Sequence, residues 1–140
     1  MKRLTMIAAP FLVLGMLAAC GPGSTPPQTM EVLLSGDNEV PPVTTDSFGS
    51  ANVTAAATTL AVDGAFEGFE ATAAHVHGPA DESENAGVVF TLGINNADSS
   101  FGGTFTMTEE QVQWFEDGLL YINVHSEANP DGEIRGQILP

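Results

Sequence analysis

The stretch LYINVHSEANPDGEIRGQI, residues 120–138, consists of two segments in which apolar and polar residues alternate, separated by a turn sequence. Such alternation is typical of strands with one buried face. Ser-Glu-Ala-Asn-Pro-Asp-Gly at residues 126–132 favours a turn between the two segments. We therefore predict an antiparallel hairpin in a protein of the all-β class. Its simplest register pairs Tyr121 with Gln137, Asn123 with Arg135 and His125 with Glu133.

The polar side chains of this hairpin are expected to share one face of the sheet, because residues two apart in a strand point the same way. His75 and His77 have the same spacing in a strand predicted over residues 72–77. If that strand joins the hairpin, all three histidines of the chain meet on this face. We name it the polar face, with the members His75, His77, Tyr121, Asn123, His125, Glu133, Arg135 and Gln137.

The rest of the chain shows more strand patterns and one helix pattern. Thr108 and Gln111 have the spacing of a capping box, so one short helix is expected near residues 108–117, ended by Gly118. Residues 39–43 contain two prolines and are expected to form an edge or crossover segment. About eight short strands with one short helix predict an antiparallel β-sandwich or barrel. The remaining strands are expected at residues 30–34, 51–56, 60–66, 87–94 and 101–107.

The N-terminal residues have the pattern of an export signal. Residues 4–16 are mostly apolar, follow a basic start and are too short to span a bilayer. They lead to Leu-Ala-Ala-Cys at residues 17–20, which resembles a bacterial lipobox and contains Cys20, the only cysteine. We expect acyl chains on Cys20 to anchor the protein in a membrane of the cell envelope. Gly21 after the cysteine, in place of Asp, favours the outer membrane.

These patterns divide the chain into three parts. Residues 1–19 are expected to be the signal peptide. Residues 20–29, rich in Gly, Pro, Ser and Thr, are expected to form a flexible tether that begins with the lipid-bearing cysteine. Residues 30–140 are expected to form the domain.

The chain is strongly acidic, with 18 Asp and Glu against three Lys and Arg. Without residues 1–19, Arg135 is the only Lys or Arg that remains. Such a charge repels nucleic acid, so we expect no nucleic-acid partner. The sequence also has no nucleophile elbow, no Gly-rich phosphate loop and no CxxC motif, and we expect the protein not to be an enzyme.

Four motifs carry a resemblance to a known family. They are NEVPPV (38–43), AHVHGPA (74–80), LYINVH (120–125) and GEIRGQI (132–138), in this order along the chain. Together they resemble the CHRD domain, which is named for chordin, and the resemblance covers residues 30–139. It implies a β-rich extracellular module without an established biochemical activity. We therefore predict a non-catalytic binding or structural module, displayed on the cell envelope, that can engage an envelope protein.

A metal site is the alternative reading of the same residues. His75, His77 and His125 on neighbouring strands offer imidazole ligands to zinc or copper. The HxH strand is also locally similar to copper/zinc superoxide dismutases, but the further ligands and the disulfide of those enzymes are missing. Calcium at the acidic loops 81–85 or 129–133 is a weaker candidate.

A purely structural role for the polar face is also open. The histidines at the strand ends would then donate hydrogen bonds to the turns at residues 78–79 and 129–132. Arg135 would pair with Glu133 or Glu39 and so order the segment that contains Glu39.

Overall fold

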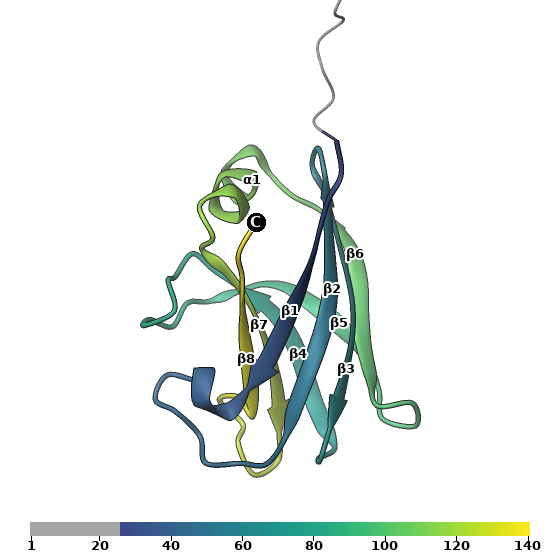
Figure 1. Ribbon diagram of the computed structural model, residues 1–140, viewed down its shortest axis with the longest axis vertical. Helices are drawn as coiled ribbons and strands as arrows, with labels where there is room; N and C mark the ends of the chain where they lie inside the picture. Colours follow the sequence, from purple (N-terminus) through teal and green to yellow (C-terminus); the bar gives the residue numbers. More distant parts are fainter. Residues whose placement is uncertain (1–25) are drawn as a thin grey trace, which may run out of the picture.

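The computed structural model describes residues 26–140, which form a closed eight-stranded antiparallel barrel with one α-helix (Figure 1). The predicted all-β class and the single short helix are confirmed. No helix among these residues is long and apolar enough to cross a membrane. The strands are β1 (Gln28–Ser35), β2 (Phe48–Ala56), β3 (Thr59–Glu67), β4 (Ala71–His77), β5 (Val88–Asn95), β6 (Ser100–Thr106), β7 (Leu120–Ser126) and β8 (Ile134–Ile138).

The barrel is made of two four-stranded sheets joined at two short seams. Around the barrel the strands follow the order β1-β2-β3-β6-β5-β4-β7-β8. Between β5 and β6 only three residue pairs are formed, and between β1 and β8 only Ser35 and Arg135 are paired. By contrast, β2 and β3 pair along nine residues each. The polar face lies entirely on the β5-β4-β7-β8 sheet.

The barrel interior is apolar because each strand turns alternate residues inward. Leu120, Ile122 and Val124 of β7 are fully buried there, with the matching residues of the other strands. Gly64 stays in the regular ladder between β2 and β6, and the ring of Phe101 fills the space in which a side chain at Gly64 would lie. The glycine is thus needed for packing and does not mark a bulge.

One helix, α1 (Glu109–Glu116), connects β6 to β7 at the end of the barrel where the described chain begins and ends (Figure 1). The predicted capping box is confirmed: the Gln111 backbone N–H donates to the Thr108 hydroxyl, and the Thr108 N–H donates to the Gln111 side chain. The helix buries Phe115 against the core. Gly118 follows with φ +69°, a left-handed conformation that suits the end of a helix.

Candidate metal centre

Strand β4 lies beside β7, which meets the condition for all three histidines to share one face. His75 is opposite Asn123, and His77 is opposite Tyr121. On the other side of β7 the predicted hairpin register is confirmed, with Asn123 opposite Arg135 and Tyr121 opposite Gln137. Glu133 lies just before β8, and its backbone N–H donates to the Val124 carbonyl; the predicted pair of His125 with Glu133 is therefore not part of the ladder. The polar face therefore exists as one surface across three neighbouring strands.

This face is on the outside of the barrel, yet most of its side chains are buried. Loops 36–47 and 78–87 and the turn between β7 and β8 lie over it (Figure 1). The two loops are joined where the Asn85 side-chain amide donates to the Val40 carbonyl. His77 and His125 are each only 8% exposed, and Arg135 is 1% exposed. The polar face is thus a second buried region, which lies between the outer surface of the sheet and the loops and is separate from the apolar core.

The three histidines converge. One nitrogen from each of His75, His77 and His125 lies within 4.8 Å of the other two, and the trio is the only such group of three or more His, Cys, Asp or Glu among residues 26–140. His75 Nδ1 is 3.0 Å from His125 Nε2. The ring centroids of His75 are 5.4 Å from those of His77 and 4.9 Å from those of His125. The rings would have to move closer together to place three nitrogens about 2.0–2.1 Å from one metal ion.

Hydrogen bonds determine which nitrogen of each ring carries a lone pair. His77 Nδ1–H donates to the Ala86 carbonyl at 3.0 Å, and His125 Nδ1–H donates to the Pro130 carbonyl at 2.9 Å. The Nε2 atom of each ring therefore carries the lone pair with which the ring would bind a metal. A ligand histidine whose other nitrogen is held by a carbonyl is the usual arrangement around bound metals. His125 Nε2 accepts from His75 Nδ1–H, whereas His77 Nε2 is buried without any hydrogen-bond partner.

The surroundings also favour neutral imidazoles, the form that binds metal. Burial lowers the pKa of His75, and the adjacent His125 lowers it further. Burial lowers the pKa of His77 more than its bond to Ala86 raises it. Burial likewise lowers the pKa of His125, against the opposite effects of Pro130 and Asp131.

Tyr121 and Arg135 support the trio from one side. The Tyr121 ring stacks on His77 with centroids 5.0 Å apart and planes 7° apart. The Arg135 guanidinium lies on the other side of that ring, 3.6 Å from its centroid. The Tyr121 hydroxyl accepts from the Ala86 N–H, so the segment that holds His77 is itself held in place.

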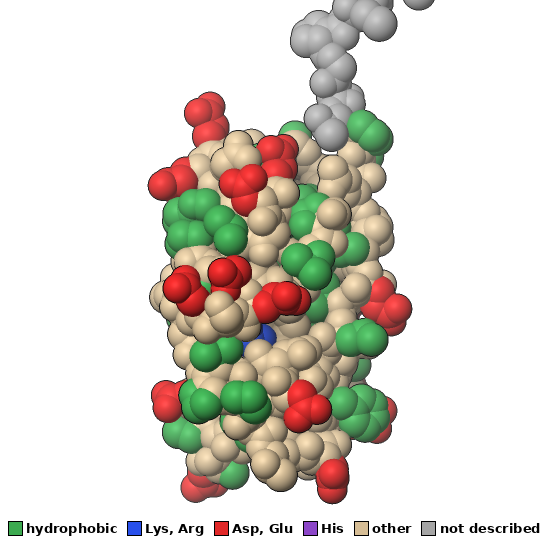
Figure 2. Space-filling view, turned by 60° about the vertical axis from the view of Figure 1, so that its left-hand side comes forward, with side chains coloured by type: hydrophobic (Ala, Val, Ile, Leu, Met, Phe, Trp, Pro, Cys, Tyr) green, Lys and Arg blue, Asp and Glu red, His purple; other side chains and the backbone are tan. Residues whose placement is uncertain are grey.

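The prediction of an ion pair between Arg135 and Glu39 or Glu133 is wrong. Arg135 instead donates to the carbonyls of Asp81 and Glu84, and to the side chains of Asn85 and Gln137. It is the only Lys or Arg among residues 26–140. Figure 2 shows one small blue area recessed among scattered acidic side chains. The arginine therefore ties loop 78–87 to β8 as a multiple hydrogen-bond donor.

Glu133 is stabilised as a carboxylate by hydrogen bonds and not by an ion pair. Its carboxylate accepts four hydrogen bonds from side chains, whose donors are Thr45, Ser47, Ser126 and Asn129. Burial alone would raise its pKa, but these bonds outweigh burial and lower the pKa to about 2. A carboxylate with this many protein donors is a structural anchor for the 126–133 turn, and it is engaged away from the histidines.

The structural reading of the histidines is correct in part. His125 bonds to the turn at residues 129–132, as expected, but His77 bonds to Ala86 and not to the turn at residues 78–79. Sequence reasoning missed the Ala86 and Pro130 carbonyls, because backbone groups leave no trace in the spacing of side chains. Residues 1–19 and Cys20 lie outside the described residues.

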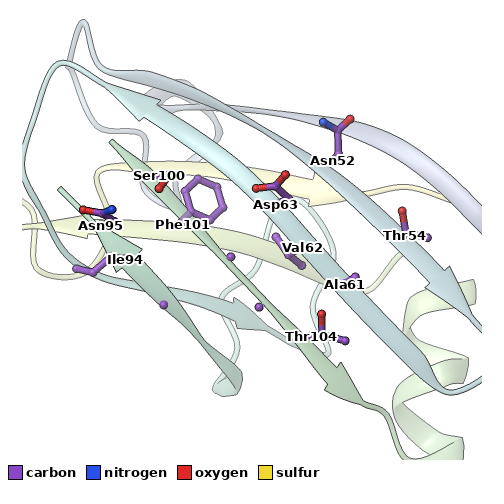
Figure 3. Close-up of a pocket in the computed structure, with 13 residues that line it drawn as sticks. Asn52, Thr54, Ala61, Val62, Asp63, Ile94, Asn95, Ser100, Phe101 and Thr104 are labelled. Carbon is purple, nitrogen blue, oxygen red and sulfur yellow. The ribbon is translucent and has the colours of Figure 1, made fainter. Parts of the chain in front are cut away.

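A shallow hollow of about 700 Å³ elsewhere on the barrel is a weaker candidate site (Figure 3). It lies over β2, β3, β5 and β6, away from the polar face. Asn52, Asp63 and Asn95 project around it, and glycines of β5 and β6 form part of its floor. Asp63 is its one ionisable side chain, so no group of catalytic or metal-binding residues converges there.

Comparison with known proteins agrees with the four motifs. The family model described as CHRD domain matches residues 30–138, which is nearly all of the described chain and contains the whole polar face. No curated protein and no solved structure matches the chain. On the extent of the family match, together with the fold and the order of the motifs, this chain belongs to the CHRD domain family.

Proposed function

We propose that this protein is a non-catalytic CHRD module of the cell envelope that binds one transition-metal ion, zinc or copper, through His75, His77 and His125. The single observation that carries the proposal is the buried Nε2 of His77. This lone pair has no donor, and it belongs to a ring that converges with the two other histidines. An unsatisfied buried acceptor is unfavourable, and a metal ion at the centre of the trio would satisfy it.

Metal binding requires one internal proton movement. In the metal-free state His75 Nδ1 carries the proton that it donates to His125 Nε2. To act as a ligand through Nδ1, His75 must carry its proton on Nε2, or lose it, as metal binding generally displaces protons. Three imidazoles leave at least one coordination position for water or a small ligand. Imidazole nitrogens suit zinc and copper, whereas calcium prefers oxygen ligands.

Elemental analysis tests this function directly. The purified protein, stripped with chelator and dialysed against Zn²⁺ or Cu²⁺, is expected to retain about one metal ion per chain, as the single three-nitrogen cluster requires. Retention should fall below pH 6, because protonated imidazoles do not bind metal. Protein that retains neither ion at neutral pH would contradict the proposal.

The envelope location rests on Cys20. We expect the Cys20→Ala variant to remain unprocessed or to leave the membrane fraction, since the acyl chains on this residue are the proposed anchor. Fractionation of cells that express wild type and variant, with immunoblotting, makes the comparison. Unchanged processing and unchanged membrane association of the variant would show that the lipoprotein assignment is incorrect.

A further inference from the structure

Two buried oxygens near the histidines have no hydrogen-bond partner. They are Glu39 Oε1 and Asn123 Oδ1. Their side chains are only 5% and 3% exposed. The same two side chains already share one hydrogen bond, in which Asn123 Nδ2–H donates to Glu39 Oε2 at 3.3 Å. Both unpartnered oxygens therefore belong to two side chains that are already hydrogen-bonded to each other.

Gly132 lies beside both of these oxygens. A Cβ atom at Gly132 would lie 2.5 Å from Glu39 Oε1 and 2.6 Å from Asn123 Oδ1. Both oxygens thus border the same point, and Gly132, with φ +147°, leaves room for them. Two buried acceptors that border the same point, neither of which has a hydrogen-bond donor, are unfavourable unless something supplies a hydrogen.

We propose that Glu39 binds a proton and forms a two-point acid–amide pair with Asn123. Glu39 Oε1–H donates to Asn123 Oδ1, while Asn123 Nδ2–H donates to Glu39 Oε2. One proton then satisfies both unpartnered oxygens and removes a buried charge. The pair is a proton-binding site separate from the three histidine ligands.

The charged groups around Glu39 fit this assignment. Burial raises the pKa of Glu39 to about 7, and the negative charge of Glu133 adds to this effect. Arg135 on β8 and the Asn123 hydrogen bond act in the opposite direction but do not outweigh burial. Asp37 in the preceding turn η1 (Gly36–Asn38) is exposed, and Asp131 contributes its backbone carbonyl to Asn123.

The acid–amide pair fastens loop 36–47 over the polar face. Glu39 is the buried side chain through which this loop contacts the centre of β7, and Asn123 lies directly opposite His75. Asn38 adds a bond from its side-chain amide to the Arg135 carbonyl. When Glu39 loses its proton, the two oxygens again oppose each other, and the loop loses one of its attachments. The pair is therefore a pH-sensitive latch beside the metal site.

Carboxyl ¹³C NMR of the purified, metal-free protein tests the latch in wild type. Glu39 is expected to titrate close to neutral pH, well above its ordinary value of 4.5. Because the folded state holds this proton more tightly than the unfolded chain does, Glu39 contributes stability that is fully present at and below about pH 4.5 and is lost as pH rises towards 7. The lowered pKa values of the three histidines act in the opposite direction, so the Glu39 contribution is read from the difference between wild type and Glu39→Gln, in which the ratio of the two unfolding constants should change by up to about two orders of magnitude between about pH 5 and 8. Titration of Glu39 below pH 5 would overturn the proposal.

The Glu39→Gln variant provides the matched neutral side chain, because its amide can both donate to Asn123 Oδ1 and accept from Nδ2. It should lose this pH dependence and be more stable than wild type at pH 8. Glu133→Gln is the control of opposite sign, because its carboxylate is held ionised: it should be less stable than wild type throughout pH 5 to 8. A Glu39→Gln variant with wild-type pH dependence would also overturn the proposal. Either variant can give the contrary result while the metal stoichiometry is unchanged. Failure of this proposal is therefore distinguishable from failure of the proposed function, which the metal stoichiometry tests.

Discussion

Replacing His77 by alanine is expected to abolish tight metal binding. The substitution removes the one ligand nitrogen that has no other partner in the metal-free protein. Loss of an outer hydrogen bond to a ligand histidine already weakens metal affinity about 10- to 100-fold, so loss of the ligand itself should cost at least about 100-fold. Competition with a chelator of known affinity, monitored for Zn²⁺ and Cu²⁺, measures the change.

Thr91→Ala is the matched control for this substitution. Thr91 pairs with His75 across β4 and β5 and is exposed, but it offers no nitrogen ligand. The control should bind metal as wild type does, and circular dichroism should show that both variants remain folded. If His77→Ala retains wild-type affinity, the histidine trio is not the metal site.

Arg135→Met is expected to destabilise the domain by about 3 kcal/mol or more. The guanidinium is almost completely buried and satisfies two backbone carbonyls and two side-chain oxygens, while it also packs on Tyr121. Methionine fills much of the volume but leaves those acceptors without donors. Urea unfolding followed by Trp fluorescence gives the change in free energy. Metal affinity should fall as well, because loop 78–87 carries the Ala86 carbonyl that orients His77.

The Arg135→Lys variant tests whether the positive charge of Arg135 or the geometry of its hydrogen bonds stabilises loop 78–87. A lysine keeps the positive charge but has no planar fork that reaches four acceptors at once. We expect it to recover only a small part of the lost stability. Wild-type stability in the lysine variant would show that the charge alone, and not the hydrogen-bond geometry, holds the loop.

Local patterns in the sequence were sufficient for the hairpin and for the polar face. Alternation in residues 119–125 and 133–139 defines which side chains share a surface, and the loop at 126–132 sets the register. The HxH spacing placed His75 and His77 on the same side of their strand, and only the choice of neighbouring strand was open. The capping box at Thr108 was likewise visible, because its two partners are three residues apart.

The partners of the buried charges could not be predicted in this way. Arg135 is bound by a loop more than fifty residues away, and Glu133 accepts from Thr45, 88 residues away. Such contacts depend on how two loops fold over the sheet, and no periodicity encodes that. The obvious rule, that a lone cation pairs with the nearest carboxylates, failed because backbone carbonyls and side-chain amide oxygens satisfy Arg135. Three hydroxyl groups and the Asn129 amide satisfy Glu133.

The two short seams of the barrel have a consequence for how the domain moves. Local opening begins where few backbone hydrogen bonds join neighbouring strands, so thermal fluctuations should separate the two sheets at β5–β6 and β1–β8 first. All three histidines, with Tyr121 and Asn123 between them, belong to one sheet. The three histidines would then keep their relative positions while the two sheets separate, and a bound ion would not be released by such opening.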